Sequence, residues 1–289
     1  MIESPTEQTR RMQALVSELW RLEGPHVENH VGDVAWMRFQ HAGREGEWRI
    51  RIWEEDGEPI AWAWIRRPGT LGHEIHPRHR GGALHDDVLD WFEANVAGDE
   101  LRVSSLTTDT ERLGFLRGRG YEIEAAARVF SYHLRKLLEI PEPSLPSGYR
   151  LRAVEPADLE ARVELHRVVW APSRVTMESY TKLQTVWPYR ADLDCVVEAP
   201  DGSLAAYCLA WLDDANRVGE LEPVGTHPDQ RRRGLAAAVC RFALRRLQEE
   251  GATRAIVYSI AGSEATALYE SIGLRQHARS LQLLKRRTF

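Results

Sequence analysis

The sequence contains little cysteine. Only three cysteines, Cys195, Cys208 and Cys240, occur among its 289 residues. An odd and scattered set of this kind forms neither a disulfide framework nor a zinc ribbon, so we expect three buried thiols. A chain of this length buries about three quarters of the surface of its unfolded form, so it needs no such cross-links to fold.

Long apolar runs and an excess of positive charge are also missing. No stretch approaches the roughly 18 consecutive apolar residues of a membrane-spanning helix. The N-terminal segment MIESPTEQTRRMQ lacks the apolar core of a secretory signal. With 43 acidic against 38 basic residues the net charge is −5, which argues against binding to nucleic acid or to an anionic membrane. We therefore expect a cytoplasmic protein with neither partner, and the oligomeric state stays open.

Proline concentrates near the middle of the chain. Residues 140–148, IPEPSLPSG, hold three prolines, two serines and a glycine, a composition that sustains neither a helix nor a central strand. It predicts a linker over 141–148 between two domains, 1–140 and 149–289. Both halves show the same order of elements, which predicts an α/β (α+β) fold of two tandem units, each with a mixed central sheet flanked by helices.

The repeated order can be followed from element to element. In the second half the pattern predicts strands over 218–226, 254–259 and 280–285, and helices over 234–250 and 264–271. In the first half it predicts strands over 70–75, 101–104 and 128–134, and helices over 84–96 and 110–116. In each half a strand ends in His-Pro and a basic turn leads into a long helix, so the two turns can be compared directly.

The turn of the second half has the composition of an anion site. Three arginines, Arg231 to Arg233, precede Gly234 and a helix that begins with small residues. The first turn of a helix presents unpaired N–H groups and the positive end of the helix dipole, and side chains this small let a phosphate approach the backbone. The turn therefore predicts a pyrophosphate cradle formed by Arg231, Arg232, Arg233, Gly234, Leu235, Ala236 and Ala237. A merely solvated basic turn is the simpler alternative.

Two motifs in the second half resemble a known family. Arg231-x-x-Gly234-x-Ala236 resembles the (Gln/Arg)-x-x-Gly-x-(Gly/Ala) signature of the GNAT acetyltransferases, and it stands, as in that family, between a strand and a long helix. The segment 265–274, ATALYESIGL, is similar to the second signature, a short helix with a tyrosine followed by glycine. The resemblance covers 149–289 and, more weakly, 1–140. It departs at Gly262, where the family usually has asparagine.

The resemblance implies a cosubstrate and a reaction. The cosubstrate is acetyl-CoA, no metal is involved, and the acetyl group passes to the amine of a small-molecule acceptor by direct attack within a ternary complex. The backbone of Val224, Gly225 and Thr226 would bind the pantetheine arm. Tyr269 matches the position of the general acid that protonates the departing thiolate. Independently, Pro223 within a strand predicts a bulge that frees backbone amides for a ligand.

A base is needed as well, because an ammonium must lose a proton before it attacks a thioester. Glu220 and Glu222 lie two residues apart on one strand and so share a face. If both point into the cleft, their mutual repulsion raises the pKa of one of them. If they face solvent, they have no such role. Glu220 also stands where GNAT enzymes place a functional glutamate, so we expect it to be the base or the anchor of the amine, with Glu222 second.

The first-half turn, HPRHRGGALHDD, fits the signature poorly. Arg78-x-x-Gly81-x-Ala83 matches it but lies close to Pro77. Aligning Leu84 with Leu235 instead places Ala83 at the glycine and His85 at the alanine. Asp86 and Asp87 would then begin the helix and repel a pyrophosphate. We expect a degenerate cofactor site with a structural or substrate-shaping role, and a second working site is the alternative.

Several functional alternatives follow from these features. The hypothesis of an enzyme has two alternatives. One is a non-catalytic sensor or scaffold that binds acetyl-CoA, and the other is a module that binds nucleic acid or a phosphate ligand through the arginine turn. The histidines His73, His76, His79 and His85 are dense, but their spacing repeats no metal motif and no cysteine joins them. We therefore expect no metal site there.

Overall fold

The fold is described from a computed structural model, which places residues 4–41 and 43–287. Its helices are α1 (Pro5–Glu23), α2 (Val31–Phe39), α3 (Ala83–Asn95), α4 (Thr110–Gly118), α5 (Leu159–Val169), α6 (Met177–Leu183), α7 (Leu235–Glu249) and α8 (Glu264–Ser271). Its strands are β1 (Arg49–Glu55), β2 (Glu58–Arg67), β3 (Thr70–Ile75), β4 (Glu100–Leu106), β5 (Glu122–Ile123), β6 (Phe130–Lys136), β7 (Arg150–Ala153), β8 (Asp194–Glu198), β9 (Leu204–Asp213), β10 (Val218–Thr226), β11 (Arg254–Ile260) and β12 (Arg275–Arg286).

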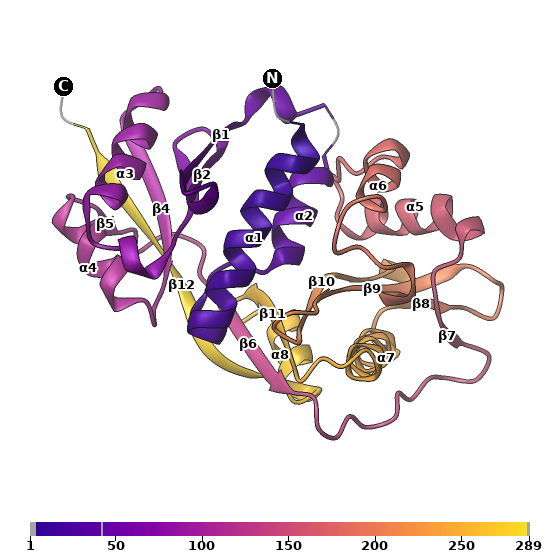
Figure 1. The fold of residues 1–289 in the computed structure, drawn as a ribbon. Coiled ribbons are helices and arrows are strands. Elements are labelled where there is room, and N and C mark those ends of the chain that lie inside the picture. The colour runs from indigo at the N-terminus through magenta and orange to yellow at the C-terminus, as the bar shows by residue number, and fades with distance from the viewer. Residues whose placement is uncertain (1–3, 42, 288–289) are drawn as a thin grey trace.

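The strands join into one mixed sheet that runs through both halves. Its order is β1-β2-β3-β4-β12-β6-β11-β10-β9-β8-β7, with β5 beside β12. Helices cover both faces, so the predicted mixed α/β architecture is confirmed (Figure 1). The predicted strand over 280–285 is longer than expected, because β12 begins at Arg275.

The two halves exchange their last strands. Strand β6, from the first half, lies between β11 and β12 of the second. The first part of β12 pairs with β6, and its remainder, Ser280 to Arg286, pairs with β4 of the first half. In Figure 1, β12 is the long yellow strand that joins the two parts of the sheet. Neither half therefore has a complete sheet of its own.

Separate apolar clusters stabilise each part of the sheet. Helices α7 and α8 pack on β8 to β11, and the buried cysteines Cys195, Cys208 and Cys240 lie in that core. Helices α3 and α4 pack on β2 to β4. A third cluster joins α1 and α2 to Trp62 and Trp64 of β2 and to Val218 of β10. This third cluster spans both halves and holds α2 against the centre of the sheet.

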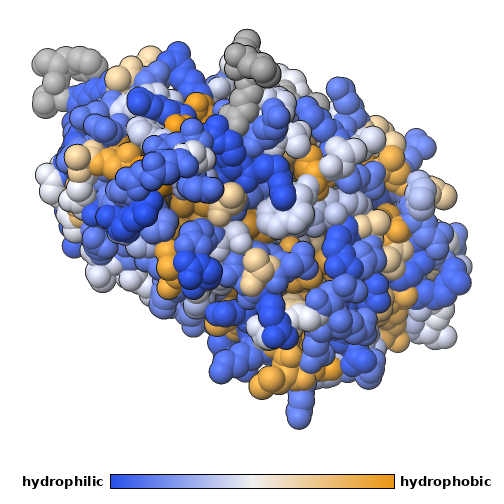
Figure 2. Space-filling model, in the orientation of Figure 1, coloured by the Kyte–Doolittle hydropathy of each residue, from blue (hydrophilic) through white to orange (hydrophobic). Residues whose placement is uncertain are grey.

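The outside of the molecule is mostly polar. Figure 2 shows hydrophilic residues over most of one face, with apolar residues scattered between them. No helix in the described ranges is long and apolar enough to cross a bilayer. Residues 137–149, which contain the predicted linker, form neither helix nor strand and run along α7, where Gln248 Nε2 donates to the carbonyl oxygens of Leu137 and Leu138 at 2.8 Å.

Candidate active site

The two central strands of the second half separate part-way along their length. Strand β10 pairs with β11 only from Val218 to Glu220. Beyond that point β10 stays paired with β9 as far as Thr226, while β11 stays paired with β6. The register of β10 shifts between Leu221 and Val224, so the predicted bulge around Pro223 is confirmed. One edge of β10 thus carries backbone groups that β11 does not take up.

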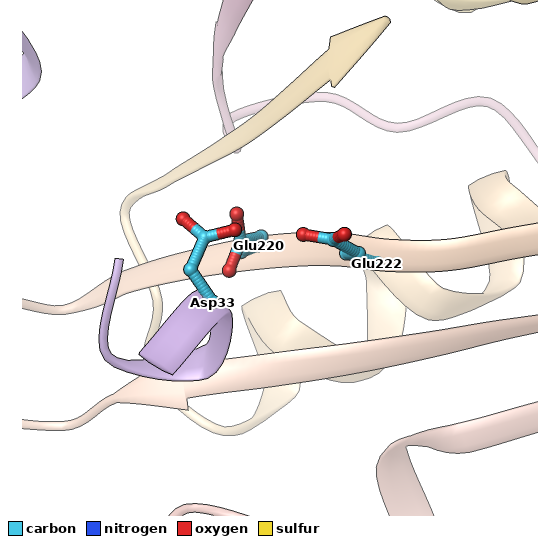
Figure 3. Close-up of side chains that lie close together, drawn as sticks. All are labelled: Asp33, Glu220 and Glu222. Atoms are coloured by element: carbon cyan, nitrogen blue, oxygen red, sulfur yellow. The ribbon is translucent and has the colours of Figure 1, made fainter. Parts of the chain in front are cut away.

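Three carboxylates meet where the strands separate. Asp33 reaches the site from α2, and Glu220 and Glu222 reach it from β10 (Figure 3). One oxygen from each side chain lies within 4.8 Å of the others. Asp33 and Glu220 are buried and Glu222 is half-buried. Glu220 and Glu222 do share a face, as their spacing predicts, and this face does not point into open solvent.

The start of α2 holds Asp33 in place. His30 is the N-cap, and its Nδ1 accepts a hydrogen bond from the amide of Gly32 at 3.1 Å. Asp33 Oδ2 in turn accepts from the amide of His30 at 2.7 Å, which completes a capping box. A Cβ on Gly32 would lie 2.3 Å from Trp211, so only glycine lets α2 approach β9 this closely.

His30 also contacts Glu220. Its Nδ1 lies 3.2 Å from Glu220 Oε2, and its Nε2 lies 3.3 Å from the carbonyl oxygen of Val218. Both His30 and Glu220 are completely buried. Within the described residues no N–H or O–H group donates a hydrogen bond to either oxygen of Glu220.

Tyr258 of β11 links the other two acids. Its hydroxyl oxygen lies 2.9 Å from Oδ1 of Asp33 and 2.7 Å from Oε2 of Glu222. The Tyr258 ring stacks on Tyr132 of β6, with ring centroids 5.3 Å apart. Burial raises the pKa of Tyr258 well above its usual value, so its hydroxyl stays protonated.

The environment favours the neutral form of both glutamates. Burial raises the pKa of Glu220 and of Glu222 well above the usual range, and the nearby Asp33 raises both further. Mutual repulsion was expected to raise the pKa of one glutamate. Instead both are raised, and burial contributes more than any neighbouring charge.

The predicted phosphate cradle lies at the start of α7. Gly234 is the N-cap, with φ +79°, and no side chain caps the helix there. A Cβ on Gly234 would meet nothing within 4 Å. The arginines before it are exposed: Arg232 makes a 3.5 Å ion pair with Glu264, and Nη1 of Arg233 donates to the Tyr149 hydroxyl at 3.3 Å. The first turn of α7 is therefore open to an anion from outside.

Tyr269, the predicted general acid, lies on α8. Its side chain is 6% exposed and packs in the core between α7 and the sheet. Burial raises its pKa well above the usual value, with smaller contributions from the thiols of Cys240 and Cys208 and from Glu222. At Gly262 the family's asparagine is missing, and the nearby Ser259 hydroxyl contacts the hydroxyl of Thr266 at 2.9 Å.

The corresponding place in the first half is built differently. Helix α3 is capped by Gly82, a register that lies between the two considered from the sequence, because the turn after His76 is one residue shorter than the turn after His227. His85 is buried and stacks on Phe115 at 3.8 Å. Strand β3 pairs with β4 only at Thr70 and Leu71, so these two strands separate as well.

The first-half opening contains a guanidinium group. Arg112 of α4 is 3% exposed and makes ion pairs with Glu74 at 2.8 Å, with Glu28 at 3.3 Å and with Asp109 at 3.4 Å. Asn29 also donates to Glu74 at 2.7 Å. Each acid at this position is therefore paired within the protein itself.

Comparison with known proteins agrees with this geometry. The Acetyltransferase (GNAT) family matches residues 161–274. A mycothiol acetyltransferase of Thermobispora bispora is 30% identical over 230 residues, which cover 76% of this chain and 74% of that protein. The chain belongs to the GNAT acetyltransferase family. A mycothiol acetyltransferase of Streptomyces coelicolor is 25% identical over 299 residues, which cover 97% of this chain and 93% of that protein.

The fold of this GNAT chain is also found in solved structures. A tandem GNAT protein from the clavulanic acid biosynthesis pathway superposes with a TM-score of 0.64 at 13% identity, covering 97% of this chain and 95% of that one. The motifs predicted a tandem GNAT protein with a two-domain architecture similar to that of mycothiol synthase, and these findings confirm it. The protein is a GNAT-type N-acetyltransferase.

Three residues of the site were missed by the sequence analysis: His30, Asp33 and Tyr258. The spacing His30-x-x-Asp33 before an apolar helix is the signal of a capping box and could have located the start of α2. Nothing in the local sequence connects this helix to β10, because 187 residues separate Asp33 from Glu220. Among the described residues, the first-half histidines form no group of three with metal-ligand spacing.

Proposed function

We propose that the second half transfers the acetyl group of acetyl-CoA to the amine of a small-molecule acceptor, by direct attack within a ternary complex. One observation carries the proposal. The edge of β10 that β11 leaves open, the acids Glu220 and Glu222 on that strand, and the uncapped start of α7 follow one another along the chain. Asp33 joins the two glutamates from α2. A site for an anionic arm and a site for a cation thus adjoin each other.

The residues fit the two ends of such a complex. Arg231 to Arg233 and the amides from Gly234 to Ala237 would bind the pyrophosphate. Those backbone groups of Val224, Gly225 and Thr226 that lie on the open edge of β10 would bind the pantetheine arm. Acetyl-CoA supplies the activated acetyl group as a thioester.

The acidic cluster takes the acceptor. Three carboxylates suit an ammonium group, which offers three N–H donors. Glu220 in its ionised form removes the proton from the ammonium, with Glu222 as the second candidate base. Tyr269 returns a proton to the leaving sulfur, and its raised pKa keeps that proton in place until then.

The half-buried Glu222 gives the direction of approach. Because Asp33 and Glu220 are fully buried and Glu222 is not, an acceptor would reach the cluster past Glu222. The mycothiol acetyltransferases among the relatives make amines related to mycothiol the first acceptors to test.

The test uses the whole chain, because the strand exchange leaves neither half with a complete sheet. Acetyl-CoA is titrated by calorimetry, and the release of free CoA thiol is then followed across a library of amines. We expect one acetyl-CoA site per chain and thiol release that requires an amine. Binding without amine-dependent release would favour the sensor or scaffold instead. Absence of binding would refute the proposal.

A further inference from the structure

Two buried carboxylates and a half-buried one, without a paired cation, pose an electrostatic problem. Among the described residues, no lysine or arginine forms an ion pair with Asp33, Glu220 or Glu222. Burying an isolated carboxylate costs several kcal/mol, so a stable protein either pairs it or neutralises it with a proton. The hydrogen-bond geometry around the cluster shows where such protons lie.

The first proton is located by His30. The amide of Gly32 points its hydrogen at Nδ1, and the carbonyl oxygen of Val218 lies beside Nε2. Both contacts require Nε2 to carry the hydrogen and Nδ1 to be an acceptor. Glu220 Oε2 lies 3.2 Å from the same Nδ1. Because Nδ1 then carries a lone pair and no hydrogen, it repels an ionised Glu220 and favours the protonated form. The buried ring is neutral, since burial lowers the pKa of His30.

The second proton is located by Tyr258. Its hydroxyl has one hydrogen but lies within hydrogen-bond distance of two carboxyl oxygens, on Asp33 and on Glu222. One of these two contacts therefore needs a hydrogen from the carboxyl group. Asp33 stands in the first turn of α2 and accepts the amide of His30, where the helix dipole favours an anion. The hydrogen thus belongs to Glu222, which donates to Tyr258, which donates to Asp33.

We propose that His30 and Tyr258 are positioning residues that hold Glu220 and Glu222 in their protonated form, so that the cluster without acceptor carries a single negative charge, on Asp33. The consequence for catalysis rests on the proposed function: binding of a cationic acceptor must release the proton of Glu220 to bulk water before that carboxylate can act as a base. The protonation itself does not depend on any reaction.

Other titratable groups face the cluster from neighbouring strands. Arg66 of β2 is a nearby cation that favours ionised Glu222, and it forms no ion pair with the cluster among the described side chains. Asp213 of β9 acts on His30, and its charge opposes the effect of burial there. Tyr132 of β6 stays neutral, since burial raises its pKa well above the usual value. These groups leave the assignment of the two protons unchanged.

Infrared spectroscopy tests the proposal without an acceptor. A protonated carboxylic acid has a C=O stretch that ionised carboxylates lack, and ordinary Asp and Glu are ionised at pH 7. We expect such bands from Glu220 and from Glu222 in the whole chain at pH 7. Glu220→Gln removes one band, Glu222→Gln removes the other, and Glu160→Gln, at an exposed position on α5, removes neither. Absence of the bands at pH 7, or bands that both variants retain, would overturn the proposal.

Variants of the positioning residues separate this role from a structural one. His30→Asn keeps an N-cap oxygen and an acceptor near Nδ1, so the Glu220 band remains, whereas His30→Ala lowers the pH at which that band fades. Tyr258→Phe lowers the pH at which the Glu222 band fades, and it leaves the Glu220 band in place. Unchanged titration of both bands in His30→Ala and Tyr258→Phe would contradict the roles of these two residues. Amine-dependent thiol release is measured separately, so failure here leaves the proposed function standing.

Discussion

Each half of this molecule opens its sheet at the same point, between β3 and β4 in the first half and between β10 and β11 in the second. Acidic side chains gather at both openings. In the first half Arg112 lies among Glu74, Glu28 and Asp109 and makes an ion pair with each of them. In the second half the cluster of Asp33, Glu220 and Glu222 has no guanidinium partner in the described structure.

The helices that follow the two openings also differ in the charge at their N-termini. Helix α3 begins with Asp86 in its first turn, whereas the first turn of α7 has no acidic residue and follows three exposed arginines. The first half therefore pairs its acidic side chains internally. In the second half the start of α7 and the acidic cluster have no such partners among the described residues, as the proposed acetyl-CoA and amine sites require. An acidic residue in an opened sheet indicates a ligand only when the protein does not pair it.

The strongest test of this difference exchanges a carboxylate for an amide in each half. Glu220→Gln should lower acetyl transfer by about 10²- to 10⁴-fold, the contribution of a general base, with acetyl-CoA affinity unchanged. Glu74→Gln should destabilise the fold and leave acetyl transfer unchanged. Thiol release with an acceptor from the amine library measures the first effect, and urea unfolding measures the second. Equal loss of activity in Glu220→Gln and Glu74→Gln would contradict the prediction that only the acids of the second half take part in acetyl transfer.

A second test removes the internal cation of the first half. Arg112→Met leaves Glu74 and Glu28 without a cationic partner, and we expect a loss of about 3–5 kcal/mol in the free energy of unfolding. Arg119→Met is the matched control, because Arg119 at the end of the same helix pairs with the exposed Asp86 and Asp90, and such pairs contribute roughly 1 kcal/mol or less. Urea unfolding compares the two variants. A loss in Arg112→Met no larger than that of the control would mean that this network is not what stabilises the first half.

A third test adds the same side chain at both helix caps. Gly234→Glu brings negative charge to the start of α7 and should weaken acetyl-CoA binding by about 10- to 100-fold. Gly82→Glu should leave binding unchanged, since φ −112° accepts any residue and a Cβ there has its nearest neighbour at 3.8 Å. Calorimetry measures both affinities. Because Gly234 has φ +79°, Gly234→Asn serves as a control for backbone strain and should retain binding. Weakened binding in Gly82→Glu would assign a cosubstrate site to the first half.

The smallest expected effect is the dependence of stability on pH. The folded protein binds protons at Glu220 and Glu222 more tightly than the unfolded chain does, because their pKa values are raised from 4.5. Their contribution is complete below that value and is lost as the pH rises through the raised pKa. Glu222→Gln should remove part of this loss, because a tenfold tighter proton in the folded state corresponds to about 1.4 kcal/mol. Thermal unfolding from acidic to basic pH measures the slope, and a slope equal to that of the parent chain would count against a protonated Glu222.

Much of the second half was predictable because its signals are local. The turn from His227 to Gly234 sets the strand end and the helix start within a few residues, and Pro223 marks the bulge on β10. The spacing of Glu220 and Glu222 placed them on one face, since side chains alternate along a strand. The roles of Tyr269 and of the cradle residues remain predictions for the experiments above.

The tandem order of elements, the family motifs and the residue types of the proposed anion site follow from the sequence alone, because they depend on neighbours a few positions apart. Only the tertiary structure decided which acids meet. Asp33 joins Glu220 through the packing of α2 against β9, and Arg112 reaches Glu74 through the packing of α4. The charge at a buried site depends on groups that are distant in the chain. These groups come into contact only in the folded protein, in which both halves share one sheet.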